Sequence, residues 1–433
     1  MKTLTLLLLL LTSLSVNAEQ LPGDIRNAPA RVSLSEVTRT VLDRNPAIQQ
    51  ALRKWAAAKE RVTQQAAWDD LKVSGNSRAA RFVDVAPNSF TDQIVSVEQI
   101  IPITGKNLTR ARIATADAVV AFEQARREQL DVVAKARASY FRLVNAYAQL
   151  ELNRRNLTSL RQLAEVSRSR YETGKASAAD ALASELEASK LLESEQDTIR
   201  SISAEQSQLN VLMNCDAFAP LGQPEDASIG PAELSMGETR ARMIGNRPEI
   251  KAAQAKIDIE KSRLDLARRN WIPDPAVTVQ AQRYNDARQA ASEIDAGVSF
   301  TVPWVNPGKY SAAIREAKEN LAAEEQGFDR TNAESLGALR DALQKVHTAK
   351  HHVDLFRDKL APQARQAFEA NQFSYESGKA TFLDWITAQR NLRDVEAMAQ
   401  QHVADYRVAL AELEAIVGAD LKIFPSTKSK EAK

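Results

Sequence analysis

Apolar and polar residues alternate with a period of two in short stretches of both halves of the chain. The alternation is partial in residues 71–85 and 94–101 and unbroken in residues 296–302, where Ala, Val, Phe and Val alternate with Gly, Ser and Thr. Period two is typical of β-strands whose two faces meet different surroundings. Turn-forming residues at 87–89 and 285–287 predict that the strands are joined as hairpins.

Three stretches contain neither glycine nor proline, which predicts unusually long helices. They are residues 106–173, 175–219 and 379–417, with lengths of 68, 45 and 39 residues. At ~1.5 Å per residue, a continuous helix over the first stretch would be roughly 100 Å long. Glycine at a helix end often adopts a positive φ. We therefore predict two long helical hairpins with Gly174 and Gly378 at their tips.

Local signals also place some helix boundaries. Ser35 is the predicted cap of a first helix, which Pro46 then interrupts. Pro362 predicts a bend or a restart within the helix that leads to Gly378. The apolar seams of the long helices are narrow and flanked by Arg, Glu and Gln. Such seams favour helices packed side by side in a wall that is wetted on both surfaces.

Several landmarks of the first half recur in the second half at an offset of 201 to 204 residues. The recurring pairs are Pro46 and Pro248, residues 101–106 and 302–309, residues 171–176 and 375–380, and Asp180 and Asp384. Their order, spacing and residue types agree. We predict two structural repeats, 19–225 and 226–423, each made of a helix, two strands and two long helices. A polar tail, 424–433, follows.

The first 18 residues have the organisation of a signal peptide. A positive start, Met1-Lys2, precedes an apolar run from Leu4 to Leu11, and Val16-Asn17-Ala18 fits the small-x-small cleavage rule. The run is well short of the ~20 apolar residues that span a bilayer. No later segment approaches 18 consecutive apolar residues. We therefore expect a protein outside the cytoplasm, whose membrane insertion, if any, uses strands.

Composition narrows the functional classes. Lys and Arg number 57 against 56 Asp and Glu, so no broad basic surface suggests a nucleic-acid partner. One cysteine, Cys215, excludes an internal disulfide and a cysteine-based zinc site. His347 and His351 are four residues apart, but no His-Glu-x-x-His pattern accompanies them, and a solvated polar face is the simpler interpretation. No catalytic motif stands out.

Four amphipathic strands cannot close a membrane barrel on their own. Such barrels have at least ~8 strands, and at that size side chains fill the interior. Two copies of the chain would form a plugged tube of eight strands, whereas three would supply twelve strands and room for a pore. A globular α+β protein is the alternative, although the repeat and the long helices favour the barrel.

The ordered set of motifs resembles the TolC-type outer-membrane efflux channels. The set comprises the signal peptide, the tandem halves, the strands that precede the Gly-Lys pairs 105–106 and 308–309, and the Tyr-x-x-Gly tips followed by Asp six residues after the glycine. The resemblance covers nearly all of residues 32–423. The strand endings 99–106 and 302–309 are similar to the heavy-metal branch of the family, which is CusC/CzcC-like.

The resemblance implies a mainly α protein with a β-barrel portion. Three protomers would form a 12-stranded outer-membrane barrel, four strands from each, continued by a long periplasmic α-helical barrel. The implied function is the outer-membrane channel of a tripartite efflux system, a passive duct for heavy-metal cations or drugs without catalytic residues or cofactors. The implied partners are two further copies of the chain, a periplasmic adaptor (membrane fusion) protein, an inner-membrane RND-type pump and outer-membrane lipid.

The same resemblance assigns a periplasmic gate. Asp384 matches a position where three carboxylates would surround a narrow axis and attract cations. Tyr375 and Asp180 match a hydrogen-bonded link between the hairpins. Helix capping by Asp384 and aromatic packing by Tyr375 are the structural alternatives. The chain has Ala380 and Thr387 where the general family has an arginine link and a second aspartate, which implies a looser latch and one acidic ring.

The hairpin tips are the implied contact with the adaptor. Gly174, Lys175, Gly378 and Lys379 lie there, and glycine allows close backbone approach. The two lysines have a simpler alternative as partners of the helix dipole.

Two other functions stay open at this stage. A type I secretion channel for polypeptides would have the same fold, because selectivity resides largely in the pump. A soluble periplasmic coiled-coil scaffold would explain the helices but not the paired strands.

Overall fold

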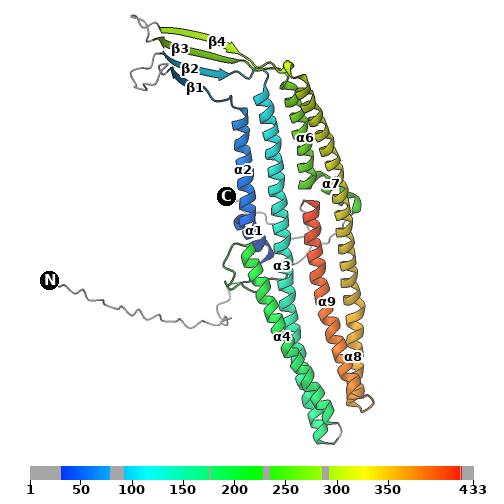
Figure 1. Cartoon of the computed structure of the whole chain (residues 1–433). Coiled ribbons are helices and arrows are strands. Elements are labelled where there is room, and N and C mark those ends of the chain that lie inside the picture. Colours follow the sequence, from blue (N-terminus) through cyan, green and yellow to red (C-terminus); the bar gives the residue numbers. More distant parts are fainter. Residues whose placement is uncertain are drawn as a thin grey trace, which may run out of the picture.

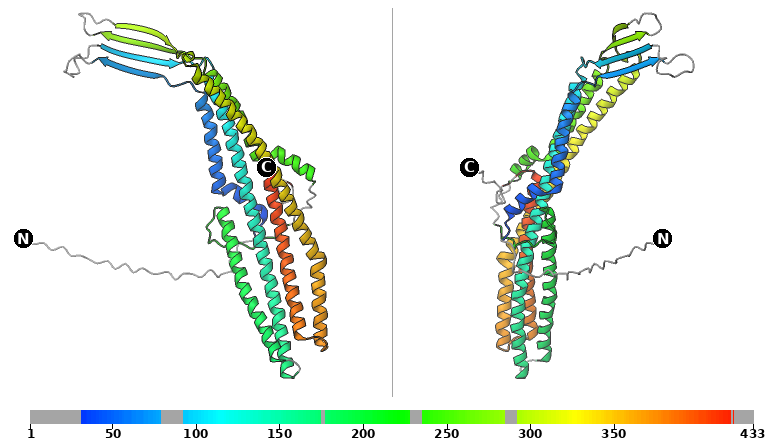
Figure 2. Two further views of the ribbon diagram at one scale, coloured as in Figure 1. Left: turned by 45° about the vertical axis from the view of Figure 1, so that its right-hand side comes forward. Right: turned by 90° about the vertical axis from the view of Figure 1, so that its left-hand side faces the viewer.

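The computed structural model describes residues 31–78, 92–174, 177–227, 235–284, 292–419 and 421. The predicted signal peptide, both predicted hairpin loops, Lys175 and the predicted C-terminal tail lie outside these residues. The molecule is elongated, with a β-sheet at one end that leads into a long body of helices (Figures 1 and 2).

The elements follow the predicted order of helices, two strands and long helices in both halves of the chain. The strands are β1 Lys72–Arg78, β2 Asp92–Ile100, β3 Ala276–Tyr284 and β4 Ser292–Ser299. The helices are α1 Leu34–Arg44, α2 Pro46–Ala66, α3 Lys106–Glu172, α4 Ala178–Leu212, α5 Met236–Asn246, α6 Pro248–Arg269, α7 Pro307–Leu355, α8 Ala361–Glu376 and α9 Phe382–Val417, with a 3₁₀ turn η3 Pro303–Val305 and a π-helix η4 Phe356–Leu360. The division into repeats at residue 225 stays a prediction.

The four strands form one antiparallel sheet in the order β1-β2-β3-β4. Because successive side chains point to opposite faces, the register decides which residues share a face. One face is largely apolar and carries Val73, Gly75, Val95, Val97, Val277, Val279, Ala281, Ile294, Ala296 and Val298, with the polar Ser77, Gln93, Gln99 and Arg283 toward its two ends. The other is mostly polar and includes Lys72, Ser74, Asn76, Ser96, Glu98, Thr278, Gln280, Gln282, Glu293 and Asp295.

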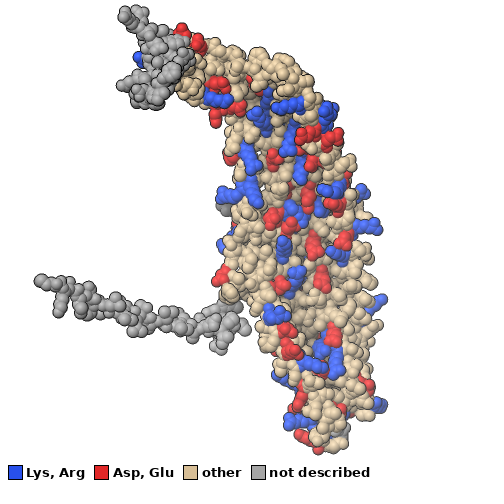
Figure 3. All heavy atoms as spheres, in the orientation of Figure 1, with Lys and Arg blue, Asp and Glu red and all other residues tan. Residues whose placement is uncertain are grey.

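Cross-strand contacts stabilise the polar face, whereas the apolar face is uncovered in the protomer. Ser74 and Ser96 share a hydrogen bond of 2.7 Å, and Lys72 Nζ lies 3.1 Å from Glu98 Oε1. On the apolar face, Ile294 is 79% exposed and Val298 is 66% exposed. Figure 3 shows acidic and basic side chains interspersed along the helices and few on the strands at the top of the view.

Asp274 fixes the sheet to the helical body. Its Oδ1 accepts hydrogen bonds from the backbone N–H and the hydroxyl of Thr104, at 3.0 and 2.7 Å. Lys106 Nζ lies 3.1 Å from Oδ2 of the same carboxylate and donates to the Ile272 carbonyl. These bonds join the start of α3 to the segment before β3, so the two halves of the chain meet where strands become helices.

Helix α3 is the central element of the body. It contacts α2 and α6 at the sheet end and α4 and α9 toward the other end (Figure 1). The main core surrounds Tyr140, Phe141 and Leu143 of α3, which are fully buried. A second, smaller core lies near the opposite end of the body from the sheet. No helix in the described part of the chain is both long and apolar enough to cross a membrane.

Most predicted helix boundaries are confirmed, and one is wrong. The first helix ends at Arg44 before Pro46, and the π-helix η4 directly precedes the helix that contains Pro362, a residue without an N–H for the helical ladder. The first N-cap is Ser33 rather than Ser35, because the Ser33 hydroxyl accepts the backbone N–H of Glu36.

Candidate functional site at the helical tips

The two helical hairpins end at the same side of the molecule, far from the sheet (Figures 1 and 2). Gly174 and Gly378 have φ values of +70° and +75°, which confirms the predicted left-handed glycines at the tips. Apart from the glycine and its two chain neighbours, no described atom lies within 4 Å of a Cβ built at either position, so the backbone conformation alone selects glycine there. Lys379 follows the second tip directly.

Asp384 caps the helix in which it lies. Its Oδ2 accepts hydrogen bonds from the backbone N–H and the hydroxyl of Thr381, at 3.0 and 2.6 Å, and Thr381 Oγ1 accepts the Asp384 N–H in return. This reciprocal pair is a capping box at the start of α9. The hydrogen bonds from Thr381 lower the pKa of the Asp384 carboxyl, so this exposed group stays ionised at neutral pH.

Asp180 occupies the equivalent cap of α4. Its carboxylate accepts the backbone N–H of Ser177, while the Ser177 hydroxyl accepts the Asp180 N–H. The structure therefore places Asp180 and Asp384 at matching helix starts, one beside each tip. Each carboxylate supports its own helix, and both lie beside the helical tips, where the resemblance predicts a gate.

Within the protomer, Tyr375 is not hydrogen-bonded to Asp180. Its hydroxyl is buried and has no hydrogen-bond partner among the described residues. The ring packs against Phe382 and Trp385, with centroid distances of 5.9 and 4.9 Å. The protomer thus shows the aromatic packing, and the predicted link to Asp180 stays a prediction for the assembled protein.

Arg170 links the two hairpins at this level. Its Nη1 donates to the Tyr375 carbonyl at 3.0 Å, and its Nη2 donates to the Glu376 carbonyl at 2.9 Å. The guanidinium carbon also lies 4.5 Å from the centroid of the Tyr375 ring. Because Tyr375 and Glu376 end α8, a positive charge at their carbonyls also compensates the helix dipole.

A second link lies farther up the hairpins and consists of Glu187, Lys190, Arg390 and Arg393, which we call the Glu187 clamp. Glu187 of α4 is 2% exposed, and its carboxylate lies 2.8 Å from Lys190 Nζ and 2.8 Å from Arg390 Nη2. Arg393 Nη1 lies 3.5 Å from the other oxygen. Burial alone would raise the pKa of Glu187, but hydrogen bonds from Lys190 and Arg390 outweigh it and lower the pKa.

Reasoning from the repeat missed Arg170 and the Glu187 clamp. The position 204 residues after Arg170 is Ser374, and the position 204 residues after Glu187 is Asn391. Arg390 likewise corresponds to Leu186 in the first half. Each charge thus exists in one half only, so a search for recurring motifs cannot find it. The one local signal is the spacing of three residues between Glu187 and Lys190 on one helix face.

In the described part of the chain, no group of three or more His, Cys, Asp or Glu is placed to hold a metal ion. His352 of α7 packs against His402 of α9 with the two rings tilted and their centroids 4.9 Å apart. Burial and the neighbouring His352 lower the pKa of His402. Cys215 is a free, exposed thiol.

Comparison with known protein families matches residues 240–419 to the family described as "Outer membrane efflux protein". The cobalt-zinc-cadmium resistance protein CzcC of Cupriavidus metallidurans is 23% identical to this chain, over 78% of the chain and 79% of that protein. The alkaline protease secretion protein AprF of Pseudomonas aeruginosa is 20% identical, over 73% of the chain and 68% of that protein.

Solved structures show the same fold. A structure of CusC, described as a study of folding and transmembrane channel formation, matches with a TM-score of 0.78 at 14% identity, over 93% of this chain and 96% of that one. The outer membrane protein VceC of Vibrio cholerae matches with a TM-score of 0.75 at 17% identity, over 90% and 96%. Residues 240–419 thus match the outer membrane efflux protein family, and the relatives and solved structures are similar to this chain over most of its length.

Proposed function

We propose that this protein is the outer-membrane channel of a tripartite efflux system and works as a homotrimer. The observation that carries this proposal is the two-faced sheet, with an exposed apolar face across all four strands and a polar face behind it. An apolar face of this kind is stable against lipid, and the polar face suits a water-filled lumen.

The number of strands supports the trimer. The sheet ends at β1 and β4, whose outer edges have no partner strand among the described residues. Unpaired edges are unstable in a membrane, and four strands are too few to close. If the edges of three copies pair, a 12-stranded barrel results, wide enough to leave a pore.

The helical body extends this duct into the periplasm. Its tips would meet a periplasmic adaptor, which in turn contacts an inner-membrane RND-type pump. Gly174, Gly378 and Lys379 are the described residues that would form the contact, together with Lys175. The channel itself performs no catalysis and holds no cofactor, because the pump supplies the energy.

The tips also form the proposed gate. Three copies of Asp384 would surround the axis with a ring of ionised carboxylates that favours cations. Arg170 and the Glu187 clamp tie the two hairpins of each protomer together, so opening requires these contacts to move or the hairpins to swing as one unit. The proposed bond between Tyr375 and Asp180 would form only in the assembled trimer.

The substrate class that we favour is heavy-metal cations. The similarity to CzcC, over more than three quarters of both chains, supports this choice. Export of polypeptides is the second candidate, and the similarity to AprF favours it. The two candidates predict different phenotypes when the gene is deleted in its host. Loss of zinc, cobalt or cadmium tolerance supports metal efflux, whereas loss of a secreted polypeptide with unchanged metal tolerance supports secretion.

A further inference from the structure

The connections between strands and helices carry exposed large apolar side chains, which we call the junction belt. The belt consists of Trp68, Ile103, Trp271, Ile272, Trp304 and Val305, all of them at least 36% exposed. Each of the four connections between strand and helix contributes at least one of these residues. Three of the five tryptophans of the chain lie here. Tryptophan at one level next to an apolar strand face is typical of a membrane–water interface.

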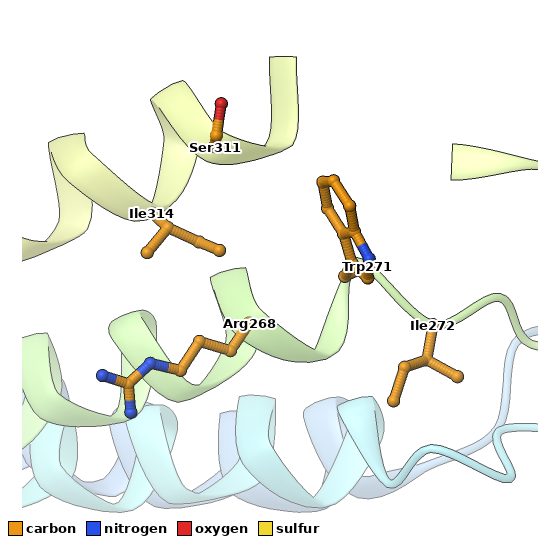
Figure 4. Close-up of a pocket in the computed structure, with 5 residues that line it drawn as sticks. All are labelled: Arg268, Trp271, Ile272, Ser311 and Ile314. Atoms are coloured by element: carbon orange, nitrogen blue, oxygen red, sulfur yellow. The ribbon is translucent and has the colours of Figure 1, made fainter. Parts of the chain in front are cut away.

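One part of the junction belt is hollowed. An open cavity of about 440 Å³ lies between the end of α6 and the first turns of α7. Its lining residues are Arg268, Trp271, Ile272, Ser311 and Ile314 (Figure 4). The lining is therefore mainly apolar, with one positive charge and one hydroxyl. A cavity of this size holds part of a large ligand rather than a few waters.

The cationic side chain in this cavity differs from its neighbours. Among the described residues, Arg268 has no ion pair and no side-chain hydrogen bond, whereas the adjacent Arg269 donates to Asp265 at 2.9 Å. Nearby Lys106 is likewise paired, with Asp274. An exposed guanidinium without a carboxylate partner is well suited to bind a phosphate group.

The arrangement of the lining separates the charge from the apolar surface. Figure 4 shows the Arg268 guanidinium extending along α6 on the side away from Ile272, while the Trp271 indole points toward α7. Ile272 is followed closely by β3, whose Val277 and Val279 belong to the apolar face of the sheet. The cavity thus runs from an apolar end next to the sheet to a positive end next to the helical body.

We propose that this cavity binds a glycerophospholipid of the periplasmic leaflet, with its phosphate at Arg268 and an acyl chain on Trp271, Ile272 and Ile314. The proposal rests on the outer-membrane location of the sheet, since only there would acyl chains reach the cavity. Two features carry it: the charge of Arg268 complements a lipid phosphate, and the apolar lining at Trp271 and Ile272 lies in the connection that leads directly into β3. A bound lipid would hold the sheet-to-helix connections at the membrane surface.

Native mass spectrometry of the detergent-purified full-length protein tests the site, with 1-palmitoyl-2-oleoyl-phosphatidylglycerol as the probe. The wild-type protein should retain up to one lipid per protomer. Arg268→Gln should weaken binding about tenfold, the effect of losing one charge-assisted contact. Trp271→Ala should weaken it through lost apolar contact. Arg315→Gln is the matched control, because Arg315 is an exposed arginine on α7 that does not line the cavity.

Glycerol 3-phosphate tests whether the headgroup alone accounts for lipid binding. It should not displace the lipid at equal concentration, because it lacks the acyl chain. Three results would overturn the site. The first is equal lipid retention by the wild type and Arg268→Gln, and the second is equal loss of lipid in Arg268→Gln and Arg315→Gln. The third is displacement of the lipid by glycerol 3-phosphate. Channel conductance is measured on the same samples, so a conducting protein without lipid selectivity rejects the lipid site and leaves the proposed channel function intact.

Discussion

Glu187→Gln is the most informative single change at the tips. Glutamine keeps the shape of the side chain and removes its negative charge. Glu187 contacts Lys190 on its own helix and two arginines of α9, so the change leaves three cations without their shared carboxylate. The second hairpin then loses one of its polar links to the first, and the links through Arg170, Asn145 and Gln149 remain.

The structure sets the size of the effect. Removing one partner from a fully buried ion pair lowers the stability of the folded protein by ~3–5 kcal/mol. Here Arg390 is 39% exposed and Lys190 is 56% exposed, so water can solvate both cations after the change. We therefore expect about 1–2 kcal/mol. If the clamp holds the closed tip, 2 kcal/mol would change a closed-to-open equilibrium roughly 30-fold.

The lowered pKa of Glu187 also determines how the stabilisation by the clamp depends on pH. A carboxyl whose pKa is lower in the clamped state stabilises that state fully above the pKa of an exposed glutamate, about 4.3. The stabilisation is lost as the pH falls through the lower pKa of the clamp. Between pH 7 and pH 5 the clamp should therefore contribute a constant amount.

Planar-bilayer conductance at pH 7, together with thermal unfolding in detergent, measures the effect. Glu187→Gln should raise conductance and lower the unfolding temperature. Glu185→Gln is the control, because Glu185 is exposed on the same helix and has no ion pair among the described residues. A double-mutant cycle with Arg390→Gln should show non-additive effects. Strict additivity, or identical behaviour of the Glu187 and Glu185 variants, would refute the clamp.

Three further predictions concern single side chains. Asp384→Asn should lower cation selectivity in planar bilayers by removing the carboxylate ring, and unchanged selectivity would exclude Asp384 as the filter. Gly378→Ala should lower the free energy of unfolding by ~1–2 kcal/mol, because alanine is strained at the positive φ of this position. Gly418→Ala should lower the free energy of unfolding further, because φ is +73° and a Cβ there would lie 3.0 Å from Arg247 Cα. Equal melting temperatures of the two variants would contradict this. Lys379→Glu should reduce crosslinking to a co-expressed adaptor, and intact crosslinking counts against the tip contact.

Much of the fold was predictable because its signals are local. Alternation in residues 296–302 predicted a two-faced strand. β4 with its register confirms the apolar side for Ala296 and Val298, but the strand ends at Ser299, so residues 300–302 lie beyond it. Gly174 and Gly378 predicted the hairpin tips, since an interruption in a long helical pattern needs a residue that tolerates positive φ. The cap at Ser33 was missed because two serines flank the helix start and both can act as caps.

The candidate site was predictable only in part. The pairs Ser177 with Asp180 and Thr381 with Asp384 are capping boxes that sequence spacing alone can indicate. The Glu187 clamp was not predictable, because its contact with Arg390 joins residues 203 apart. Only the folded hairpins bring these two residues together, and neither has a charged counterpart in the other half of the chain.

The mass and ion conductance of the purified protein test the central claim most directly. If three four-stranded sheets form one pore, the protein in mild detergent has three times the mass of a protomer and produces stable ionic currents in a planar bilayer. A particle with the mass of a single protomer and no current would contradict this account.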